Sequence, residues 1–274
     1  MKNLLAHGRS RMNGTRFKLI GIILMVCDHI HQMFINFTMP ARFNITWLSM
    51  LGRPVLPMFL FALSEGMQHT RNRKKYLLLL FGASIVMFIA MYLLQEGVHV
   101  EGVELMNNVF RTLFITGLYM VFYDMLRKGI QAKSVKKILS TIGLILIPII
   151  VSIAILMVIM KFSDILPQWA FIGFMIVPNL FMVEGGLTAV ILGILFYIFR
   201  KWRRAQVAAL AAFSLLSFLT HNPESGANIQ RIMIFAAIPM LLYNGQKGKG
   251  RKYFFYVFYP LHIAILYVMA YFLS

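Results

Sequence analysis

Long apolar segments alternate with short basic ones along this chain. The apolar runs are about 15 to 23 residues long, and polar residues do not alternate within them. Helices of that length match the hydrocarbon thickness of a bilayer, whereas a barrel would require alternating strands. We therefore predict an all-α, polytopic membrane helical bundle of about nine or ten transmembrane helices. A basic cytoplasmic arm, residues 1–16, would precede a single transmembrane domain over residues 17–274.

The expected helices cover residues 17–38, 51–67, 76–95, 108–125, 138–160, 185–199, 205–220, 229–243 and 253–273. The remaining apolar stretch, residues 168–183, contains Pro178 and Asn179. A full crossing there would place the basic residues 200–204 outside, against the positive-inside rule. We expect this stretch to re-enter the membrane or lie on its outer face, as the wall or lid of a pocket.

Charge and composition support a membrane location. Of the residues, 59% are hydrophobic and 13% charged, and the mean hydropathy is +0.75, whereas soluble domains carry about 25% charged residues. The net charge of +18 does not indicate nucleic-acid binding, because the cations are spread between apolar runs. These cations cluster before residue 17 and at 68–75, 126–137, 200–204 and 244–252. The positive-inside rule then predicts a multi-pass protein of the inner or plasma membrane with a cytoplasmic N-terminus.

Ionisable residues inside the expected helices are costly in lipid and are functional candidates. They are Asp28, His29, His31, Arg53, Glu65, Arg111, Arg231 and His262. A metal site is not expected, since there is no H-E-x-x-H motif and Cys27 is the single cysteine.

Lys18 and His29 are spaced so that they share one face of the first helix. Eleven residues correspond to about 1,100° of rotation and about 16 Å of rise. Lys18 would lie at the cytoplasmic mouth and His29 near mid-membrane, both facing one cavity. That arrangement suits a ligand with a phosphate tail and a reactive tip, such as an acyl-coenzyme A, with His29 as general base. The alternative is a snorkelling lysine and a hydrogen-bonded packing histidine.

The other charged residues suggest supporting roles. Asp28 points about 100° away from His29, so we expect it to pair with an intramembrane arginine. Arg53, Arg111 and Arg231 each lie near the outer start of a helix. Together they would form an anion-friendly region that shapes the acceptor site or stabilises an oxyanion, or else they pair internally or snorkel outward.

Further candidates lie near the cytoplasmic side and on the last helix. His262, preceded by Tyr259 and Pro260, could be a second base or a hydrogen-bond partner. Glu65 and His69, four residues apart, would form a local pair on one helix face. The glycine-rich basic loop at 244–252 could meet nucleotide phosphates or be an ordinary positive-inside turn.

Several stretches resemble the TraX family, which is related to acyltransferase family 3 of membrane acyltransferases. The matching stretches are the Lys18 to His29 pattern, residues 52–59 and 64–66, residues 69–76, residues 242–245 and residues 252–262. The resemblance implies transfer of acetyl from cytoplasmic acetyl-CoA to an acceptor at or beyond the membrane. The family's namesake acts in conjugation and acetylates the N-terminus of a pilin subunit. Pro54, directly after Arg53, departs from the family pattern, which has an aliphatic residue there.

We therefore expect an acetyltransferase acting on an amine or hydroxyl of a pilin-like protein or a cell-surface glycan. The catalytic candidates are His29, Arg53 and Asp28. The coenzyme-binding candidates are Lys18, Arg71, Lys75, Lys247 and Arg251. The acceptor-binding candidates are Arg111, Arg231, His262, Tyr259 and Glu65. The alternatives are a transporter or flippase, and an assembly factor of a conjugation apparatus without catalysis.

Overall fold

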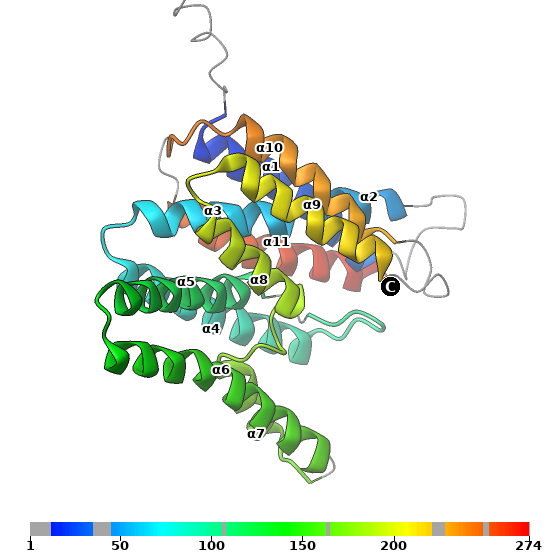
Figure 1. The fold of residues 1–274 in the computed structure, drawn as a ribbon. Helices are drawn as coiled ribbons and strands as arrows, with labels where there is room; N and C mark the ends of the chain where they lie inside the picture. The colour runs from blue at the N-terminus through cyan, green and yellow to red at the C-terminus, as the bar shows by residue number, and fades with distance from the viewer. Residues whose placement is uncertain are drawn as a thin grey trace, which may run out of the picture.

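The fold is a bundle in which every named element is a helix (Figure 1). The computed structural model describes residues 12–34, 45–105, 108–162, 165–220, 228–248 and 252–273. The helices are α1 Gly14–Phe34, α2 Thr46–Gly52, α3 Val55–His69, α4 Arg73–Gly97, α5 Val109–Gln131, α6 Val135–Phe162, α7 Gln168–Ile176, α8 Gly186–Ile198, α9 Arg203–Leu219, η3 Gln230–Ala236, α10 Ala237–Leu242 and α11 Lys252–Leu273.

Within the described residues, six segments are long and apolar enough to cross a bilayer. They are α1, Trp47–His69, α4, α5, α6 and Tyr253–Leu273. The shorter apolar helices Gly186–Ile198 and Gln230–Leu242 lie beside them, and α8 packs against both α3 and α5. The prediction of an all-α polytopic membrane bundle is confirmed.

One end of the bundle, here called the basic end, consists of the turns after α3, α5 and α8 together with residues 243–248. It lies on the left of Figure 1, while the last helix ends on the right. The exposed cations there include Arg71, Lys74, Lys75, Arg127, Lys128, Lys137, Lys201, Arg204 and Lys247. The described members of the basic clusters, which the positive-inside rule assigned to one side of the membrane, therefore meet at one end of the fold.

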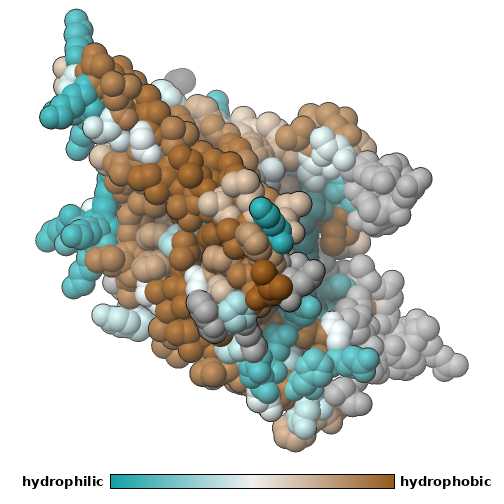
Figure 2. Space-filling view, turned by 90° about the horizontal axis from the view of Figure 1, so that it is seen from below, coloured by the Kyte–Doolittle hydropathy of each residue, from teal (hydrophilic) through white to brown (hydrophobic). Residues whose placement is uncertain are grey.

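The surface between the two ends is mostly apolar. Figure 2 shows a broad hydrophobic face with hydrophilic residues gathered toward its margins. On α6 the large side chains Leu146, Ile147, Ile150 and Met157 are all exposed. A soluble monomer rarely exposes a contiguous apolar face of this kind, so lipid is the natural surrounding for α6.

Helix α7 is too short to cross a bilayer. Its nine residues rise about 13.5 Å, less than half of the roughly 30 Å hydrocarbon core. The irregular chain that follows has its polar groups satisfied by neighbours: Asn179 donates to the carbonyl oxygens of Phe174 and Val177, and Leu180 N donates to Ser152 Oγ at 2.7 Å. Non-helical backbone at membrane depth requires such partners. Residues 168–183 thus contain no helix long enough to span, which agrees with the prediction for this stretch.

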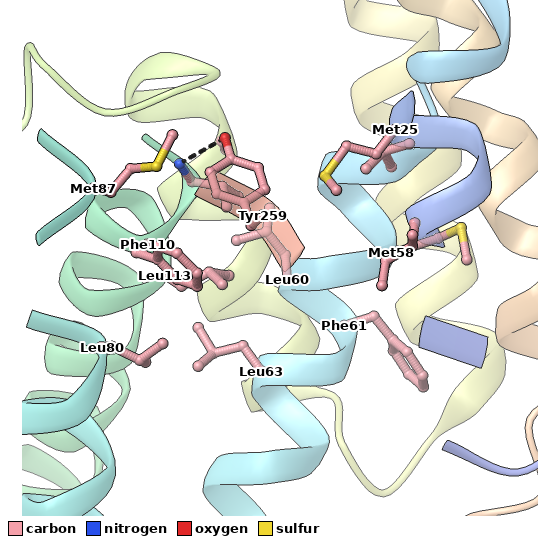
Figure 3. Close-up of a cluster of buried hydrophobic side chains, with 14 of the residues drawn as sticks. Met25, Met58, Leu60, Phe61, Leu63, Leu80, Met87, Phe110, Leu113 and Tyr259 are labelled. Carbon is pink, nitrogen blue, oxygen red and sulfur yellow. Dashed lines mark hydrogen bonds between the residues drawn. The ribbon is translucent and has the colours of Figure 1, made fainter. Parts of the chain in front are cut away.

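The core lies where α3 meets α1, α5 and α8. Figure 3 shows its packing, with Leu60 and Leu63 of α3 facing Leu113 of α5, and Met58 lying toward Met25 of α1. The close approach of α8 to α5 depends on Gly193, since a Cβ there would lie 2.4 Å from Thr116 Cγ2. Small residues at helix contacts allow such tight packing in membranes, and this packing holds α1, α3 and α8 around one cavity.

Candidate functional site

A cavity of about 410 Å³ lies between α1, α3, α8, α9, η3 and α11. Most of its wall is apolar, with Met25, Leu60 and Leu192 deep inside. Its polar and charged lining residues are Asp28, His29, Arg53, Glu184, Thr188, Ser217, Thr220, Gln230 and Tyr259. A mostly apolar pocket with a few convergent polar groups is the usual form of a small-molecule site.

His29 brings a titratable ring to this cavity from the buried side of α1. Only 2% of His29 is exposed, and its Nδ1 lies 2.7 Å from Nε2 of His262 on α11. The His262 ring does not line the cavity and lies behind His29. Tyr259 packs edge-on against His29, with ring centroids 6.1 Å apart. An imidazole held in this way can accept a proton from a ligand in the cavity.

Asp28 and Arg53 form an ion pair on the wall beside His29. Arg53 Nη2 lies 2.9 Å from Asp28 Oδ1, and the same guanidinium donates to the backbone oxygen and the hydroxyl of Ser49. Helices α1 and α2 touch at Gly52, where an added Cβ would lie 2.3 Å from Asp28 Cβ. The prediction that Asp28 pairs with an intramembrane arginine is confirmed.

Pro54 explains how Arg53 is presented to the cavity. It precedes the first residue of α3 with φ −68°, at a helix start where its missing N–H costs no hydrogen bond. The chain breaks between α2 and α3 at this point, and Arg53 lies in the break. The departure from the family pattern therefore coincides with the turn that holds the Arg53 guanidinium.

Glu184 is the acidic residue of the site that the sequence did not single out. It precedes the left-handed Gly185 (φ +76°), and Thr112 Oγ1 donates to its backbone oxygen at 3.2 Å. Its Oε2 is buried and has no hydrogen-bond partner in the part of the chain that the structure describes. Burial, with a smaller effect from Asp28, raises the pKa of the Glu184 carboxyl to about 7. The available signal was an acid just before Gly185-Gly186 in an otherwise apolar stretch.

A second cavity of about 440 Å³ shares Glu184 with the first. It lies between α4, α7 and the start of α5, and its wall includes Met91, Ile172 and Phe181. Residues 172–183 thus form part of its wall, as the sequence predicted for this stretch. Arg111 also lines this second cavity, where its guanidinium donates to the backbone oxygens of Met175 and Met182.

The three candidate arginines do not gather at one site, so the expectation of a common anion-friendly region is wrong. Arg53 lines the first cavity and Arg111 lines the second. Arg231 is exposed and lies over the ring of Phe218, 5.6 Å from its centroid. The preceding residue, Gln230, lines the cavity instead, because successive residues of a 3₁₀ helix point about 120° apart.

Lys18 and His29 share the face of α1 that packs on α11. Lys18 Nζ lies 5.3 Å from the ring centroid of Phe255, and His29 contacts His262. The predicted common stripe is confirmed. The predicted cavity joining them is not seen, because Lys18 lines neither described cavity and buried Ile22 and Met25 lie between the two positions along the helix.

The remaining coenzyme candidates lie at the basic end. Arg71, Lys75 and Lys247 are exposed, and Arg251 lies outside the described residues. The loop carrying Lys247 is docked on the start of α1, where Gly14 N donates to Gln246 O at 2.7 Å. Lys247 is thereby brought close enough to Lys18 to interact electrostatically.

Glu65 is also at the basic end and does not line either described cavity, so an acceptor contact there is not supported. Its Oε1 accepts from Arg203 Nη1 at 3.4 Å, and the Arg203 guanidinium stacks over Phe61 at 4.3 Å from the ring centroid. The Glu65–His69 pair expected on α3 forms through the Glu65 backbone oxygen, 2.8 Å from His69 Nδ1.

Tyr259 does line the first cavity, as predicted, whereas His262 does not. The Tyr259 hydroxyl accepts a hydrogen bond from Val109 N at 3.4 Å, drawn as the dashed line in Figure 3. Tyr259 is only 4% exposed. Its role as a wall of the cavity is thus fixed by a contact between α11 and the start of α5.

Fold and site together define a multi-pass α-helical membrane protein with a cavity that presents a histidine, an acid–arginine pair and a second acid. Comparison with known proteins gives the family. The pattern of the TraX protein family matches residues 13–270, so the chain belongs to the TraX family.

One relative is described as "Probable fimbrial assembly protein FimC, serogroup H1" of Dichelobacter nodosus. It is 27% identical over 274 aligned residues, which cover 92% of this chain and 93% of the relative. No solved structure matches the chain.

Proposed function

We propose that the protein is a membrane-embedded acetyltransferase that moves an acetyl group from acetyl-CoA to an acceptor held in the first cavity. The observation that carries the proposal is a buried histidine facing a cavity whose wall also holds an arginine and an acid, Glu184, whose Oε2 has no hydrogen-bond partner among the described residues. In this reaction the acceptor atom attacks the thioester carbonyl carbon while His29 takes its proton. The carbon–sulfur bond then breaks, and the coenzyme thiolate leaves and is protonated.

Arg53 is the group positioned to stabilise negative charge that develops on the carbonyl oxygen. Its guanidinium lines the cavity, and its contacts to Asp28 and Ser49 hold it in one orientation. Donors fixed before the reaction stabilise an oxyanion most effectively, because they need no reorganisation. Asp28 serves as the partner that holds Arg53 in place.

The acetyl donor is proposed to approach from the basic end, which the positive-inside rule orients toward the cytoplasm of a plasma membrane. Lys18, Lys247, Arg71 and Lys75 supply cations for the coenzyme phosphates there. The face of α1 shared by Lys18 and His29 then sets the path for the thioester arm. Because apolar side chains fill that path in this structure, delivery requires a movement of α1 relative to α11.

The charge of the cavity favours an amine over a hydroxyl as the acceptor. Asp28 and Arg53 form an ion pair, whereas Glu184 has no ion pair among the described residues and only a longer-range attraction to Arg53. A protonated amine would supply the missing partner for Oε2, and a carboxylate hydrogen bond to a cation is among the stronger kinds. Transfer of one ammonium proton to the Glu184 carboxylate would then free the lone pair for attack, and His29 would take the second proton as the amide forms. The name of the Dichelobacter relative and the family name both suit an acceptor that is a subunit of a surface fibre.

The test is acetyl transfer by the purified full chain in detergent, with acetyl-CoA carrying a labelled acetyl group. We expect coenzyme release with the wild type, and a fall of about 10²- to 10⁴-fold in His29→Ala, the usual contribution of a general base. His99→Ala, at an exposed position, is the matched control. Equal rates for His29→Ala and the wild type would remove His29 from the mechanism.

Acetylation of surface proteins and surface polymers, compared between wild-type and deletion strains, would then identify the acceptor. No coenzyme release from a folded wild-type protein, together with a fibre defect in the deletion strain, would favour an assembly factor instead. Solute flux through the protein in vesicles would favour a transporter.

A further inference from the structure

We infer that His262 is a positioning residue that fixes the tautomer of His29, so that Nε2 of His29 is the proton-accepting atom in the cavity. The effect on rate rests on the proposed acetyl transfer, whereas the tautomer itself does not. His262 belongs to the last helix, 233 residues from His29 along the chain. It lines neither described cavity, so it acts through His29 and not on the acceptor.

The inference starts from a backbone carbonyl, which can only accept a hydrogen bond. His262 Nδ1 lies 2.8 Å from the oxygen of Phe258, so Nδ1 must carry the hydrogen and donate it. In a neutral imidazole the other nitrogen then has a lone pair and accepts. His262 Nε2 is therefore an acceptor, and it faces His29 Nδ1 at 2.7 Å.

The same constraint applies to His29. Its Nδ1 must donate to His262 Nε2, so Nδ1 carries the hydrogen of a neutral His29 ring. The lone pair is therefore on Nε2, the ring nitrogen of His29 that does not face His262. Because His29 lines the cavity, this lone pair is the one available to a ligand there. The opposite assignment would set the Nδ1 lone pair of His262 against the Phe258 oxygen, which is repulsive.

The His262 ring is held by stacking as well as by its hydrogen bonds. The Phe258 ring lies parallel to it, at 5.0 Å between centroids and 10° between planes. Tyr259 packs edge-on at 5.7 Å. A side chain fixed on two sides keeps its Nε2 aimed at His29, and this is the usual way in which a supporting residue orients a catalytic one.

This arrangement resembles the orienting partner of a catalytic triad, with a neutral imidazole in place of a carboxylate. When His29 takes the acceptor proton on Nε2, its Nδ1–H continues to donate to His262. A neutral partner stabilises the resulting imidazolium less than a carboxylate would. The proton is therefore released readily once the thiolate leaves.

The direct test is the tautomer of His29, read from ¹⁵N chemical shifts of the full chain labelled with ¹⁵N-histidine in detergent or lipid. His29→Gln identifies the His29 signals by their loss, and His99→Gln is the control at an exposed position. We expect hydrogen on Nδ1 and a bare Nε2 at His29, and a shift toward hydrogen on Nε2 in His262→Leu. Hydrogen on Nε2 of wild-type His29 would overturn the inference.

The kinetic test compares His262→Leu with His262→Gln. The leucine removes the acceptor and should lower kcat by about 10- to 100-fold with little change in KM, as expected for loss of a supporting residue. Glutamine offers an amide oxygen to His29 and an amide N–H to Phe258, so it should recover part of kcat. Equal kcat for His262→Leu and wild type would overturn the inference.

The two measurements separate this inference from the proposed function. The expected tautomer in a protein that never turns over acetyl-CoA would support the positioning contact and refute acetyl transfer. Acetyl transfer with no response of the His29 tautomer to His262→Leu would support the enzyme and refute the contact.

Discussion

Two groups of charges in the described part of this bundle differ in their surroundings, because one lines the first cavity and the other lines neither described cavity. At the basic end, Asp124 accepts from Arg73, from the Tyr197 hydroxyl at 2.7 Å, and lies 3.8 Å from Arg200. In the first cavity, Asp28 pairs with Arg53, while Glu184 keeps an oxygen without a partner. Burial of a charge inside the bundle alone therefore does not identify a functional site.

The two groups differ in how completely the polar atoms of their charged side chains are paired. The Asp124 cluster ties α4, α5 and α8 together, and both arginines also lie over the Tyr197 ring, at 5.9 and 4.2 Å from its centroid. Charges of that kind hold helices in place, and removing one leaves the others unpaired. Charges around the cavity instead leave polar atoms available to a ligand. The following predictions test this contrast.

The largest effect is expected from Asp124→Ala. It leaves two arginines facing Tyr197 without a counter-ion, and loss of such a partly buried network should cost between the roughly 0 to 1 kcal/mol of an exposed pair and the roughly 3 to 5 kcal/mol of a buried one. We expect a clear fall in the thermal midpoint in detergent, with near-normal kcat in the protein that remains folded. Asp28→Ala is the matched variant in the cavity and should lower the midpoint less, because the cavity can admit water to Arg53. A larger loss of stability for Asp28→Ala would contradict the contrast.

An intermediate effect is expected from Arg53→Lys. Lysine keeps the positive charge but cannot reach Asp28 and both oxygens of Ser49 with one planar group. We predict a fall of about tenfold in kcat for acetyl transfer, since the oxyanion donor loses its fixed geometry. Melting temperature should change little. An unaltered kcat would show that Arg53 serves packing only.

The smallest effect is a change in the pH dependence of stability caused by Glu184→Gln. Because burial raises the pKa of Glu184 from 4.5 to about 7, the native state holds this proton more tightly than the unfolded state does. Wild-type stability should then fall as pH rises from about 5 to about 8, and Glu184→Gln should flatten that slope. We expect the melting temperature to change by about 2 to 4 °C for each kcal/mol of this linkage. Parallel pH profiles for the two proteins would refute a Glu184 whose pKa is raised by burial.

The spans and their ends could be predicted from the sequence because hydropathy and cation clusters are local signals. The boundaries of α4 and α5 were refined by capping residues: Asn72 accepts from Lys75 N, and Asn108 accepts from Arg111 N. Those caps extend or shift the helices by only a few residues, so the fold class did not depend on them.

The site could be predicted only in part, for physical reasons. His29, Arg53 and Asp28 were found because a charge inside an apolar run is conspicuous. Glu184 was missed because it follows a segment with no helical period. The contact of His29 with His262 joins the first helix to the last, and no local pattern reports a contact at that separation.

That contact has a consequence for biosynthesis. His29 is synthesised 233 residues before His262, so α1 enters the membrane well before α11 is made. The loop that contacts Gly14 through Gln246 is also synthesised late. The contacts of α1 with this loop and with α11 therefore form only after the middle helices have been made. Chains grow at about 5 to 20 residues per second, which puts the delay at tens of seconds. Until α11 has been made and inserted, the growing chain therefore lacks a complete histidine pair.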